Sequence, residues 1–501
     1  MTNEWKANAM DSRTSARQLK EYVGASDIYI NGSFRPAARQ MDVLEKATGI
    51  TLGSVGLGGS DDLDSAVEAA EDAQKEWAAH PYSTRAEFMH EVASRLADHT
   101  DELVELIMRE TGSIRGKAEY EVAASLDELR AAASLATHPL GEVLASQDPA
   151  RLSLSVREPV GVIGLITPWN FPLVLAMRVI APAIALGNSV ILKPSPETPL
   201  SGGLFIAALF HEAGAPAGVF QVLCGEQTFS EALVAHPGIK MVHFTGSTGV
   251  GSQIAATAGG LLKRVSLELG GNNAFVVLSD ADPEYASMLG AWSSFHYQGQ
   301  TCISAGRHLV HSSLIDAYTE AIARRAREIQ VGDPVDGTNG LGPMINERQA
   351  ARADDLLARS IALGAQVVTG GRRDGLFFQP TVLSGVTREM PIWTEEVFAP
   401  IVPIMAFEDD AEAVGLVNES HYGLVNAVVT EDEAKGRRFA RASRSGMVHI
   451  NDATPIDEAV APFGGISASG YGGRSGGLAN IEEFTERKWI SVRQGRTEYP
   501  Y

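Results

Sequence analysis

Cysteine is scarce in this sequence: Cys224 and Cys302 are the only two in 501 residues. One disulfide is the most that two cysteines can form, and a chain of this length that lacks a secretory signal is expected to keep both as thiols. The first residues, MTNEWKANAMDSR, have neither the basic start nor the apolar stretch of such a signal. These absences exclude a disulfide-rich secreted scaffold and predict a cytoplasmic protein.

Basic residues and long apolar runs are also in short supply. Lys and Arg number 41 against 62 Asp and Glu, which gives a formal net charge of −21, and no Lys/Arg-rich run interrupts the acidic balance. Such a chain repels phosphate backbones, so we expect no nucleic-acid partner. The longest apolar region, PLVLAMRVIAPAIALGNSVIL, is broken by Arg178 and Pro182. It predicts a helix followed by a buried strand, and no membrane association.

What is present is the pattern of a large α/β protein. With 501 residues, 45% of them hydrophobic, the chain is long enough for two or three domains. Helical patterns fill residues 61–136, and Gly112 is placed to end one of the helices. From 151 to 268, apolar runs such as SVILK, VFQVL and MVHFTG alternate with helical stretches, and a second series starts near 271. This alternation predicts parallel βαβ units in doubly wound sheets.

A glycine-rich turn follows one of the predicted strands. In MVHFTGSTGVGSQIAATAG, the strand leads through Gly246, Gly249 and Gly251 into a helix, whose first N–H groups can bind a phosphate. The spacing differs from the G-x-G-x-x-G dinucleotide fingerprint, which occurs nowhere in the chain. The local pattern is therefore equally compatible with a dinucleotide site and with a structural turn.

Three polar residues stand at the ends of predicted strands. Lys193 ends SVILK, Asn170 follows GLITPW, and Glu268 comes directly before a Gly pair in VSLELGGNN. Carboxyl ends of parallel strands line the crevice of an open α/β sheet, where a lysine binds phosphate or ribose, an asparagine stabilises an oxyanion, and a desolvated glutamate acts as a base. A solvated lysine, a turn-forming asparagine and an ion-paired glutamate remain open alternatives at this point.

The two cysteines have different settings. Cys302 lies in QGQTCISAGR, a connection between a helical and a stranded segment, and is the candidate nucleophile. Cys224 closes the strand-like VFQVLC and is interpreted as a small core residue. His308 and His311 are three apart in a predicted strand and so point to opposite faces, and no other spacing suits a metal. We expect no metal site.

Several motifs in order along the chain resemble the aldehyde dehydrogenase superfamily: TPWNFP, LKPSPETP, FTGSTGVG, LELGGNN, GQTC, EEVFAPI and PFGGISASGYG. Segments such as CISAGRHLVH and GGRSGGLANIEEFTERKWIS are most similar to bacterial benzaldehyde dehydrogenases, which act on aromatic aldehydes. The resemblance implies two Rossmann-like doubly wound α/β domains and a small β oligomerisation element. It places the dinucleotide-binding domain at 1–139 and 159–270, the catalytic domain at 271–470, and the oligomerisation element with the C-terminal tail at 140–158 and 471–501.

The resemblance also implies a mechanism. Cys302 is the nucleophile that forms a thiohemiacetal and then a thioester with the substrate, and Asn170 with the Cys302 backbone N–H forms the oxyanion hole. Glu268 is the general base that activates water for thioester hydrolysis. The expected reaction is oxidation of a benzaldehyde-like aldehyde to the free acid. Other aldehydes (vanillin, salicylaldehyde, phenylacetaldehyde or aliphatic ones), acyl transfer to coenzyme A, and a non-catalytic structural role are the alternatives.

The implied cofactor is NAD. Strongly NAD-selective members of the family carry a glutamate three residues after the crevice lysine, whereas this chain has Pro196 there and its nearest carboxylate, Glu197, one residue later. NADP use therefore stays open. The cofactor contacts implied by the resemblance are Trp169, Lys193, Ser195, Gly246, Ser247, Gly251, Gly270, Glu396 and Phe398.

The remaining implied features are the substrate site and the assembly. An aromatic and apolar funnel suits a benzaldehyde ring, and the family resemblance suggests a homodimer or homotetramer. Arg178 either meets a substrate substituent or pairs internally, and the sequence does not decide between the two. The residues expected to line the funnel are Phe171, Leu175, Arg178, His296, Thr301, Ile303 and Phe463.

Overall fold

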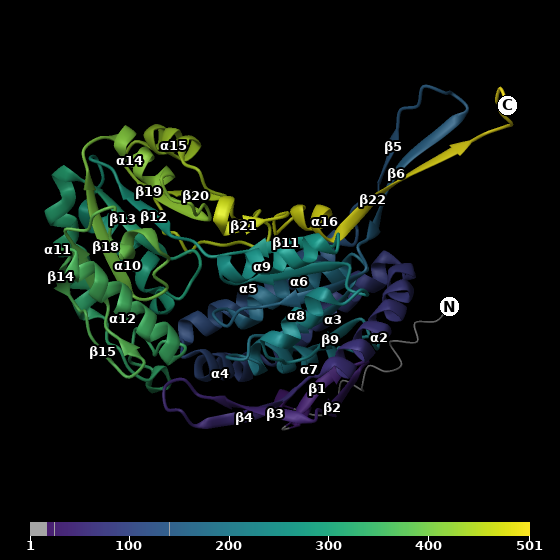
Figure 1. Cartoon of the computed structure of the whole chain (residues 1–501), viewed down its shortest axis with the longest axis horizontal. Coiled ribbons are helices and arrows are strands. Elements are labelled where there is room, and N and C mark those ends of the chain that lie inside the picture. Colours follow the sequence, from purple (N-terminus) through teal and green to yellow (C-terminus); the bar gives the residue numbers. More distant parts are fainter. Residues whose placement is uncertain (1–17, 25, 140) are drawn as a thin grey trace.

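The computed structural model describes residues 18–24, 26–139 and 141–501. They form two α/β units side by side, and a long β arm projects from one end of the molecule (Figure 1). Each unit is built around one large sheet. The predicted alternation of strands and helices is confirmed in both units.

The first sheet has the strand order β2-β1-β9-β8-β7-β10-β11-β21. Its five strands from β9 to β11 run parallel. Strands β1, β2 and β21 add to the two edges in antiparallel pairs. Strands β1 and β2, and the separate hairpin β3-β4, precede residue 60 and are not among the predicted elements. The bounds are β1 Asp27–Ile30, β2 Ser33–Pro36, β3 Arg39–Leu44, β4 Thr51–Leu57, β7 Val162–Ile166, β8 Ser189–Lys193, β9 Phe220–Val222, β10 Met241–Thr245, β11 Arg264–Glu268 and β21 Gly470–Tyr471.

Helices cover both faces of this sheet. Alternate residues of β7 enter different cores: Ile163 and Leu165 pack with one group of helices, and Val162 and Ile166 with the other. The predicted helical stretch is four helices, and Gly112 ends the third of them with a φ of +72°, as predicted. The helices are α2 Ser60–Ala79, α3 Tyr82–Asp98, α4 Thr100–Thr111, α5 Arg115–Leu135, α6 Pro172–Ala185, α7 Phe205–Glu212, α8 Gln227–Ala235 and α9 Thr248–Gly260.

The second sheet has the order β14-β17-β18-β13-β12-β19-β20, with all strands parallel except the edge strand β14. Its core lies between helices on both faces. The strands are β12 Asn273–Val277, β13 Ala305–His311, β14 Gln366–Thr369, β17 Thr381–Ser384, β18 Ile401–Phe407, β19 Val425–Val429 and β20 Met447–Ile450, and the small hairpin is β15 Arg373–Asp374 with β16 Phe377–Phe378. The helices are α10 Pro283–Phe295, α11 Ile315–Glu328, α12 Glu347–Ala362, α13 Pro391–Thr394, α14 Asp410–Asn418 and α15 Glu433–Ala442.

The arm is a three-stranded antiparallel sheet of order β22-β6-β5. It joins the strand-like segments RLSLSVRE and RKWISV, which lie more than 300 residues apart in the sequence and pair along their whole length. Helix α16 leads directly into β22 (Figure 1). The bounds are β5 Gly141–Leu144, β6 Arg151–Pro159, α16 Ala479–Phe484 and β22 Thr485–Arg493.

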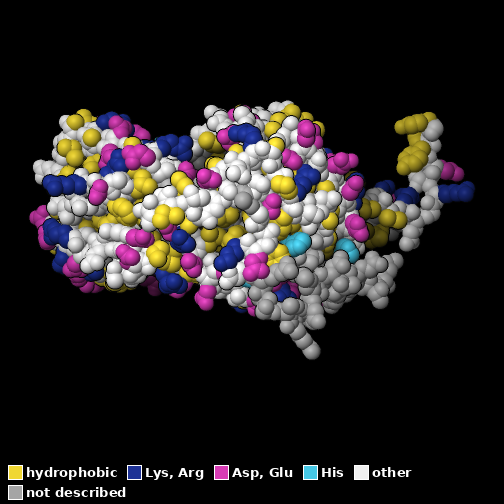
Figure 2. Space-filling view, turned by 90° about the horizontal axis from the view of Figure 1, so that it is seen from below, with side chains coloured by type: hydrophobic (Ala, Val, Ile, Leu, Met, Phe, Trp, Pro, Cys, Tyr) yellow, Lys and Arg dark blue, Asp and Glu magenta, His cyan; other side chains and the backbone are white. Residues whose placement is uncertain are grey.

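The surface seen in Figure 2 mixes acidic and basic side chains, and no large area of one charge covers this face. The arm carries hydrophobic side chains at its exposed end (Figure 2). Among residues 18–24, 26–139 and 141–501, no helix is long and apolar enough to cross a membrane.

The topology fixes where a ligand can bind. In the first sheet the chain adds β8 and β9 on one side of β7 and then β10 and β11 on the other, so the strand order reverses between β7 and β10. Loops diverge at such a point and leave a crevice beyond the carboxyl ends of the strands. Asn170 and Gly246 follow β7 and β10, and both therefore lie at this crevice.

Candidate active site

The crevice contains a cavity of about 300 Å³ at the carboxyl ends of β7, β10 and β11. Residues of the second unit close it from the other side, among them Cys302, Glu396 and Phe398. Its volume is in the range of small-molecule sites. The cavity is lined by Pro168, Trp169, Asn170, Leu175, Thr245, Gly246, Ser247, Thr248, Gly249, Glu268, Leu269, Gly270, Cys302, Gln349, Arg352, Glu396, Phe398 and Tyr422.

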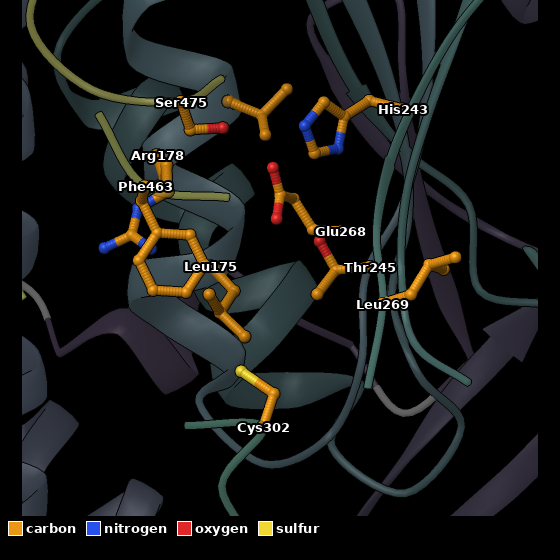
Figure 3. Close-up of a pocket in the computed structure, with 10 residues that line it drawn as sticks. Leu175, Arg178, His243, Thr245, Glu268, Leu269, Cys302, Phe463 and Ser475 are labelled. Carbon is orange, nitrogen blue, oxygen red and sulfur yellow. The ribbon is translucent and has the colours of Figure 1, made fainter. Parts of the chain in front are cut away.

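A second, much smaller cavity of about 10 Å³ adjoins it. In Figure 3 it extends from the Cys302 sulfur past the Glu268 carboxylate to His243 and Ser475. The residues that line both cavities are Leu175, Thr245, Glu268, Leu269 and Cys302. The predicted nucleophile and the predicted base therefore stand at the junction of the two cavities.

The loop before Cys302 has an unusual backbone that the surrounding protein holds in place. Tyr297, Gln298 and Gly299 have φ values of 49°, 55° and 67°, in the left-handed region that costs non-glycine residues about 1–2 kcal/mol each. The Tyr297 hydroxyl donates to the Thr111 carbonyl at 3.2 Å, and Gln298 Nε2 donates to two further carbonyls. A Cβ at Gly299 would lie 2.3 Å from the Ala399 carbonyl oxygen, so only glycine fits.

Cys302 itself is partly exposed. Its carbonyl accepts a hydrogen bond from Asn273 Nδ2 at 2.8 Å, and the same amide nitrogen donates to the Ser304 carbonyl at 2.7 Å. Its backbone N–H has no partner among the described residues, so it can donate to a ligand. Desolvation raises the pKa of the thiol to about 12, and the nearby Glu396 and Glu268 carboxylates add to the increase. In this environment the resting thiol is protonated.

Glu268 ends β11 and is 6% exposed. Desolvation raises the pKa of its carboxyl to about 8, although Arg474 and Arg178 counteract the effect. Its Oε2 atom is buried and has no hydrogen-bond partner among the described residues. Figure 3 shows the carboxylate turned away from the Cys302 sulfur and towards the end of the small cavity where His243 and Ser475 lie. The carboxyl is therefore desolvated and free to bind a water molecule or a proton.

Asn170 lies on the loop after β7 and is 3% exposed. Its Nδ2 donates one hydrogen bond, to the Gln300 carbonyl at 3.1 Å, which fixes the side chain against the cysteine loop. An amide nitrogen has two N–H groups, so a second donor is available towards the large cavity that Asn170 and Cys302 share. The arrangement fits the predicted oxyanion hole.

The glycine turn after β10 fits an anionic ligand. Ser247 is the N-cap residue of α9, but its side chain makes no capping hydrogen bond, so the first amides of this helix remain available on the cavity wall. The Gly246 N–H donates to the Glu268 carbonyl at 3.0 Å, which couples the turn to the predicted base. A Cβ at Gly270 would lie 2.5 Å from Glu396 Oε2, so glycine here lets the Glu396 carboxylate approach the backbone closely.

Trp169, Glu396 and Phe398 form another wall of the large cavity. The Trp169 and Phe398 rings meet edge to face at 5.5 Å. Glu396 Oε1 accepts a hydrogen bond from the Gly271 N–H at 2.9 Å, and desolvation raises the pKa of this carboxyl to about 7. Phe398 has a φ of 53°, a strained backbone of the kind found at ligand sites.

Three of the predicted cofactor residues do not line the cavity. Lys193 ends β8 and is 6% exposed, and desolvation lowers the pKa of its amine to about 8. Ser195 Oγ accepts the Glu197 N–H at 3.2 Å in a local turn. A Cβ at Gly251 would lie 2.4 Å from Leu269, so this glycine allows α9 to pack closely on the end of β11.

Glu197 is already engaged. One carboxylate oxygen is 2.7 Å from Lys46 Nζ, and the other accepts from Asn346 Nδ2 at 2.7 Å. Its charge is compensated, and both oxygens are occupied by residues of this chain. Pro196 at the preceding position is exposed and offers no carboxylate.

Arg178 is paired internally. Its guanidinium is buried, donates to Glu128 Oε1 at 2.9 Å and also binds Asp457, and it lies 4.6 Å from the centre of the Phe463 ring. Of the two interpretations that the sequence allowed, the structure supports internal pairing. Leu175, Arg178 and Phe463 line the small cavity beside Cys302.

The other predicted funnel residues lie around this cavity but do not line it. Phe171 packs edge to face on Tyr297 and 6.4 Å from the His296 ring. Thr301 is buried and its hydroxyl has no partner among the described residues, and Ile303 packs in one cluster with Phe463. These four residues line neither the small nor the large cavity.

Several lining residues were not predicted. His243 and Thr245 on β10 and Ser475 on the C-terminal loop line the small cavity, and Thr248, Gln349, Arg352 and Tyr422 line the large one. His243 and Thr245 stand two apart in the strand that leads to the glycine turn, so both lie on the same face of the sheet. That periodicity was the available signal for them. Ser475 and the residues of the second unit carry no local signal.

No group of three His, Cys, Asp or Glu side chains in the described part of the chain is placed to hold a metal ion. His308 is buried, and its two nitrogens contact the Ser294 and Tyr318 hydroxyls at 2.7 Å. It is a hydrogen-bonded core residue.

Known proteins share both this sequence and this fold. The chain is 46% identical over 460 residues to a benzaldehyde dehydrogenase (NAD(+)) of Pseudomonas putida, covering 92% of this chain and 94% of that protein. It is 45% identical to a vanillin dehydrogenase of Amycolatopsis sp., covering 93% and 96%. The crystal structure of a Staphylococcus aureus betaine aldehyde dehydrogenase in complex with NAD+ superimposes with a TM-score of 0.93 at 32% identity, covering 96% and 97%.

An NADP-dependent enzyme of E. coli superimposes with a TM-score of 0.91 at 34% identity, covering 94% of this chain and 98% of that one. The family model of the aldehyde dehydrogenases matches residues 34–490. The predicted fold, with its two doubly wound α/β units and β arm, is therefore the fold of these structures. The chain belongs to the aldehyde dehydrogenase family.

Proposed function

We propose that this protein oxidises an aromatic aldehyde of the benzaldehyde type to the carboxylic acid, with NAD as its cofactor. The observation that carries the proposal is that Cys302 and Glu268 both line each of the two adjoining cavities. A nucleophile and a base that share a cavity can form and then hydrolyse a covalent intermediate. The names of the benzaldehyde and vanillin dehydrogenases among its relatives support the substrate class.

Cys302 carries out the first step in this proposal. The thiol is partly exposed and first releases its proton to solvent water. The resulting thiolate adds to the carbonyl carbon, and the carbonyl oxygen becomes the oxyanion of a thiohemiacetal. The free N–H of Cys302 and the second N–H of Asn170 are the donors for this oxyanion. Removal of one such donor costs about 10²–10³ in rate.

The cofactor residues belong to the large cavity. When bound, NAD supplies the hydride acceptor that turns the thiohemiacetal into a thioester. The free amides at the start of α9 suit the pyrophosphate, and Trp169, Glu396 and Phe398 form the wall near Cys302. Lys193, with a desolvated amine at the end of β8, is the remaining candidate for the adenosine end. NADP is the second candidate cofactor, because Pro196 and the paired Glu197 leave little charge to repel a 2′-phosphate.

Glu268 carries out the last step. As a carboxylate it accepts a proton from water, whose hydroxide adds to the thioester carbonyl and displaces the Cys302 thiolate. The product is a free acid. The role assigned to Glu268 is activation of water, which favours hydrolysis over acyl transfer to coenzyme A.

The walls beside Cys302 favour an uncharged aromatic substrate. Leu175 lines the large cavity and presents apolar surface there, and Ile303 and Phe463 belong to one apolar cluster with Cys302. Arg178 is occupied by Glu128 and Asp457, so it offers no free charge to a substrate anion.

The arm supports assembly into a homodimer or homotetramer. Its three strands expose large apolar side chains, including Val143 at 75% and Trp489 at 68% exposure. A second copy of the chain would cover such a surface.

The proposed domains are 1–139 with 159–270 for dinucleotide binding, 271–470 for catalysis, and 140–158 with 471–501 for assembly. Both cysteines are free thiols, which favours a cytoplasmic location.

The test is a substrate panel. Benzaldehyde, vanillin, salicylaldehyde, phenylacetaldehyde and a short aliphatic aldehyde are each assayed with NAD and with NADP, and the acid product is quantified. We expect the highest kcat/KM for a benzaldehyde with NAD and no activity in Cys302→Ala. A preference for the aliphatic aldehyde would refute the substrate class, and activity that survives in Cys302→Ala would refute the mechanism. Acyl-coenzyme A as the product in the presence of coenzyme A would refute hydrolysis.

A further inference from the structure

A group of buried polar atoms behind Glu268 has no role in the steps above. His243 is 1% exposed, and neither of its ring nitrogens has a hydrogen-bond partner among the described residues. The same holds for Glu268 Oε2 and for the Ser475 hydroxyl. All three side chains line the small cavity, and Figure 3 shows them around its end opposite Cys302.

The strand register brings two of these residues together. Thr245 of β10 pairs with Glu268 of β11, so the two side chains lie on the same face of the sheet. His243 is two residues before Thr245 and therefore points to that face as well. Phe484 of α16 covers the imidazole, with the ring centres 6.5 Å apart. The histidine is thus enclosed on the sheet face that carries the proposed base.

Unsatisfied polar groups of this kind are expensive. A buried donor or acceptor without a partner costs about 1–3 kcal/mol, and most such groups in folded proteins bind another group or an ordered water. The small cavity has about 10 Å³ of space, which is roughly what one water molecule needs, and it has the two to four polar neighbours that hold one.

We propose that His243 is a positioning residue of the hydrolytic step: together with Ser475 it holds one water molecule against Glu268 Oε2. The inference rests on the proposed function of Glu268. The bound water donates one hydrogen to Oε2 and is fixed by a ring nitrogen of His243 and by the Ser475 hydroxyl. It orients the carboxylate and stabilises its charged form, which is the form that takes a proton from the hydrolytic water.

The histidine is suited to this task because it stays neutral. Desolvation, with a contribution from the Arg178 charge, lowers the pKa of His243 to about 3. A neutral imidazole offers one donor and one acceptor and adds no charge beside Glu268. The charged groups that act on Glu268 are Arg474 and Arg178, which favour its carboxylate, and Glu483 and Asp457, which oppose it. A water that donates to Oε2 acts in the same direction as the two arginines.

The experiment uses the full-length enzyme and 4-nitrophenyl acetate, an ester that acylates a reactive thiol without a cofactor. The initial burst of nitrophenol reports acylation of Cys302, and the steady rate reports hydrolysis of the acetyl thioester. The steady rate is measured against pH for the wild type and for His243→Leu, His243→Asn and Ser475→Ala. The leucine variant removes both ring nitrogens, and the asparagine variant keeps one donor and one acceptor.

We expect the burst to persist in all four proteins. Loss of the water should move the midpoint of the hydrolytic pH profile upward by about one unit in His243→Leu, because the carboxylate loses a hydrogen bond. The midpoint should return towards the wild-type value in His243→Asn and rise by a smaller amount in Ser475→Ala. His308→Leu is the matched control, since it removes an equally buried histidine of the second sheet and should leave the midpoint unchanged.

An unchanged midpoint in both His243→Leu and Ser475→Ala would overturn the inference, as would an equal shift in His308→Leu. Hydrolysis of the ester that continues at the wild-type rate in Cys302→Ala would instead count against Cys302 as the nucleophile. The two failures are therefore distinguishable. If His243→Leu does not fold, the Ser475→Ala profile decides between the outcomes.

Discussion

Replacement of Glu268 by glutamine separates the two halves of the proposed reaction. Gln keeps the size and one oxygen of the side chain but cannot accept a proton. Acylation and hydride transfer should survive, whereas hydrolysis of the thioester should slow by about 10²–10⁴, the usual contribution of a general base. The expected record is a burst of NADH of about one equivalent per active site, followed by a very slow steady state.

The pH dependence of thioester hydrolysis is a second test of Glu268 as the base. The base must be deprotonated, so hydrolysis should slow as the pH falls through the pKa of Glu268. Since desolvation raises this pKa to about 8, only about one tenth of the carboxyl groups would be ionised at pH 7, and the rate should rise by up to about tenfold between pH 7 and pH 9. The water proposed beside Oε2 would lower the midpoint, so it should be no higher than about pH 8.

The assay is rapid mixing of enzyme, NAD and benzaldehyde with NADH fluorescence as the signal. Glu110→Gln is the control: Glu110 is a buried carboxyl whose pKa is also raised, to about 7, but it binds Ser201 and the Leu200 N–H and lies outside both cavities. It should keep a normal ratio of burst to steady rate. A steady rate in Glu268→Gln equal to that of the wild type, or the loss of the burst itself, would refute the reasoning.

Three further outcomes are expected. Arg178→Leu should lower the free energy of unfolding by about 3–5 kcal/mol in a urea titration, because two buried carboxylates lose their partner. The control Arg324→Leu removes an exposed ion pair and should leave the urea concentration at half-unfolding nearly unchanged. Pro196→Glu should raise the ratio of kcat/KM with NAD to that with NADP by about tenfold or more, since an added carboxylate repels the 2′-phosphate, and an unchanged ratio would contradict the proposed position of the adenosine ribose. Trp489→Glu on the exposed face of β22 should shift the molecular mass in light scattering towards the monomer, and an unaltered mass would argue against assembly through the arm.

Much of the fold could be predicted because its signals are local. Apolar runs of strand length alternate with helical periodicity from residue 151 onward, and that alternation alone specifies parallel βαβ units. Gly112 ends α4 because the left-handed conformation there favours glycine, which is also a local property. Strand β2 at the sheet edge and strands β3 and β4 of the separate hairpin are only partly buried, so their periodicity is weak, and β1 is buried but only four residues long.

The sequence by itself determined the family and the chemical candidates: a thiol in a connection, a glutamate before a glycine pair and an asparagine after a strand each stand in a recognisable motif. Only the tertiary structure decided what these residues face. It joined Arg178 to Glu128 and Asp457, bound Glu197 to Lys46 and Asn346, and brought Ser475 to the cavity of Glu268.

The physical reason is that side-chain periodicity fixes a face within one strand or helix, whereas contacts between distant segments depend on strand order and register. His243 faces Glu268 because β10 pairs with β11 in a particular register. Cys302 reaches the same cavity because the second unit packs across the crevice of the first. Neither relation is encoded in a local pattern, and both are required for the proposed reaction.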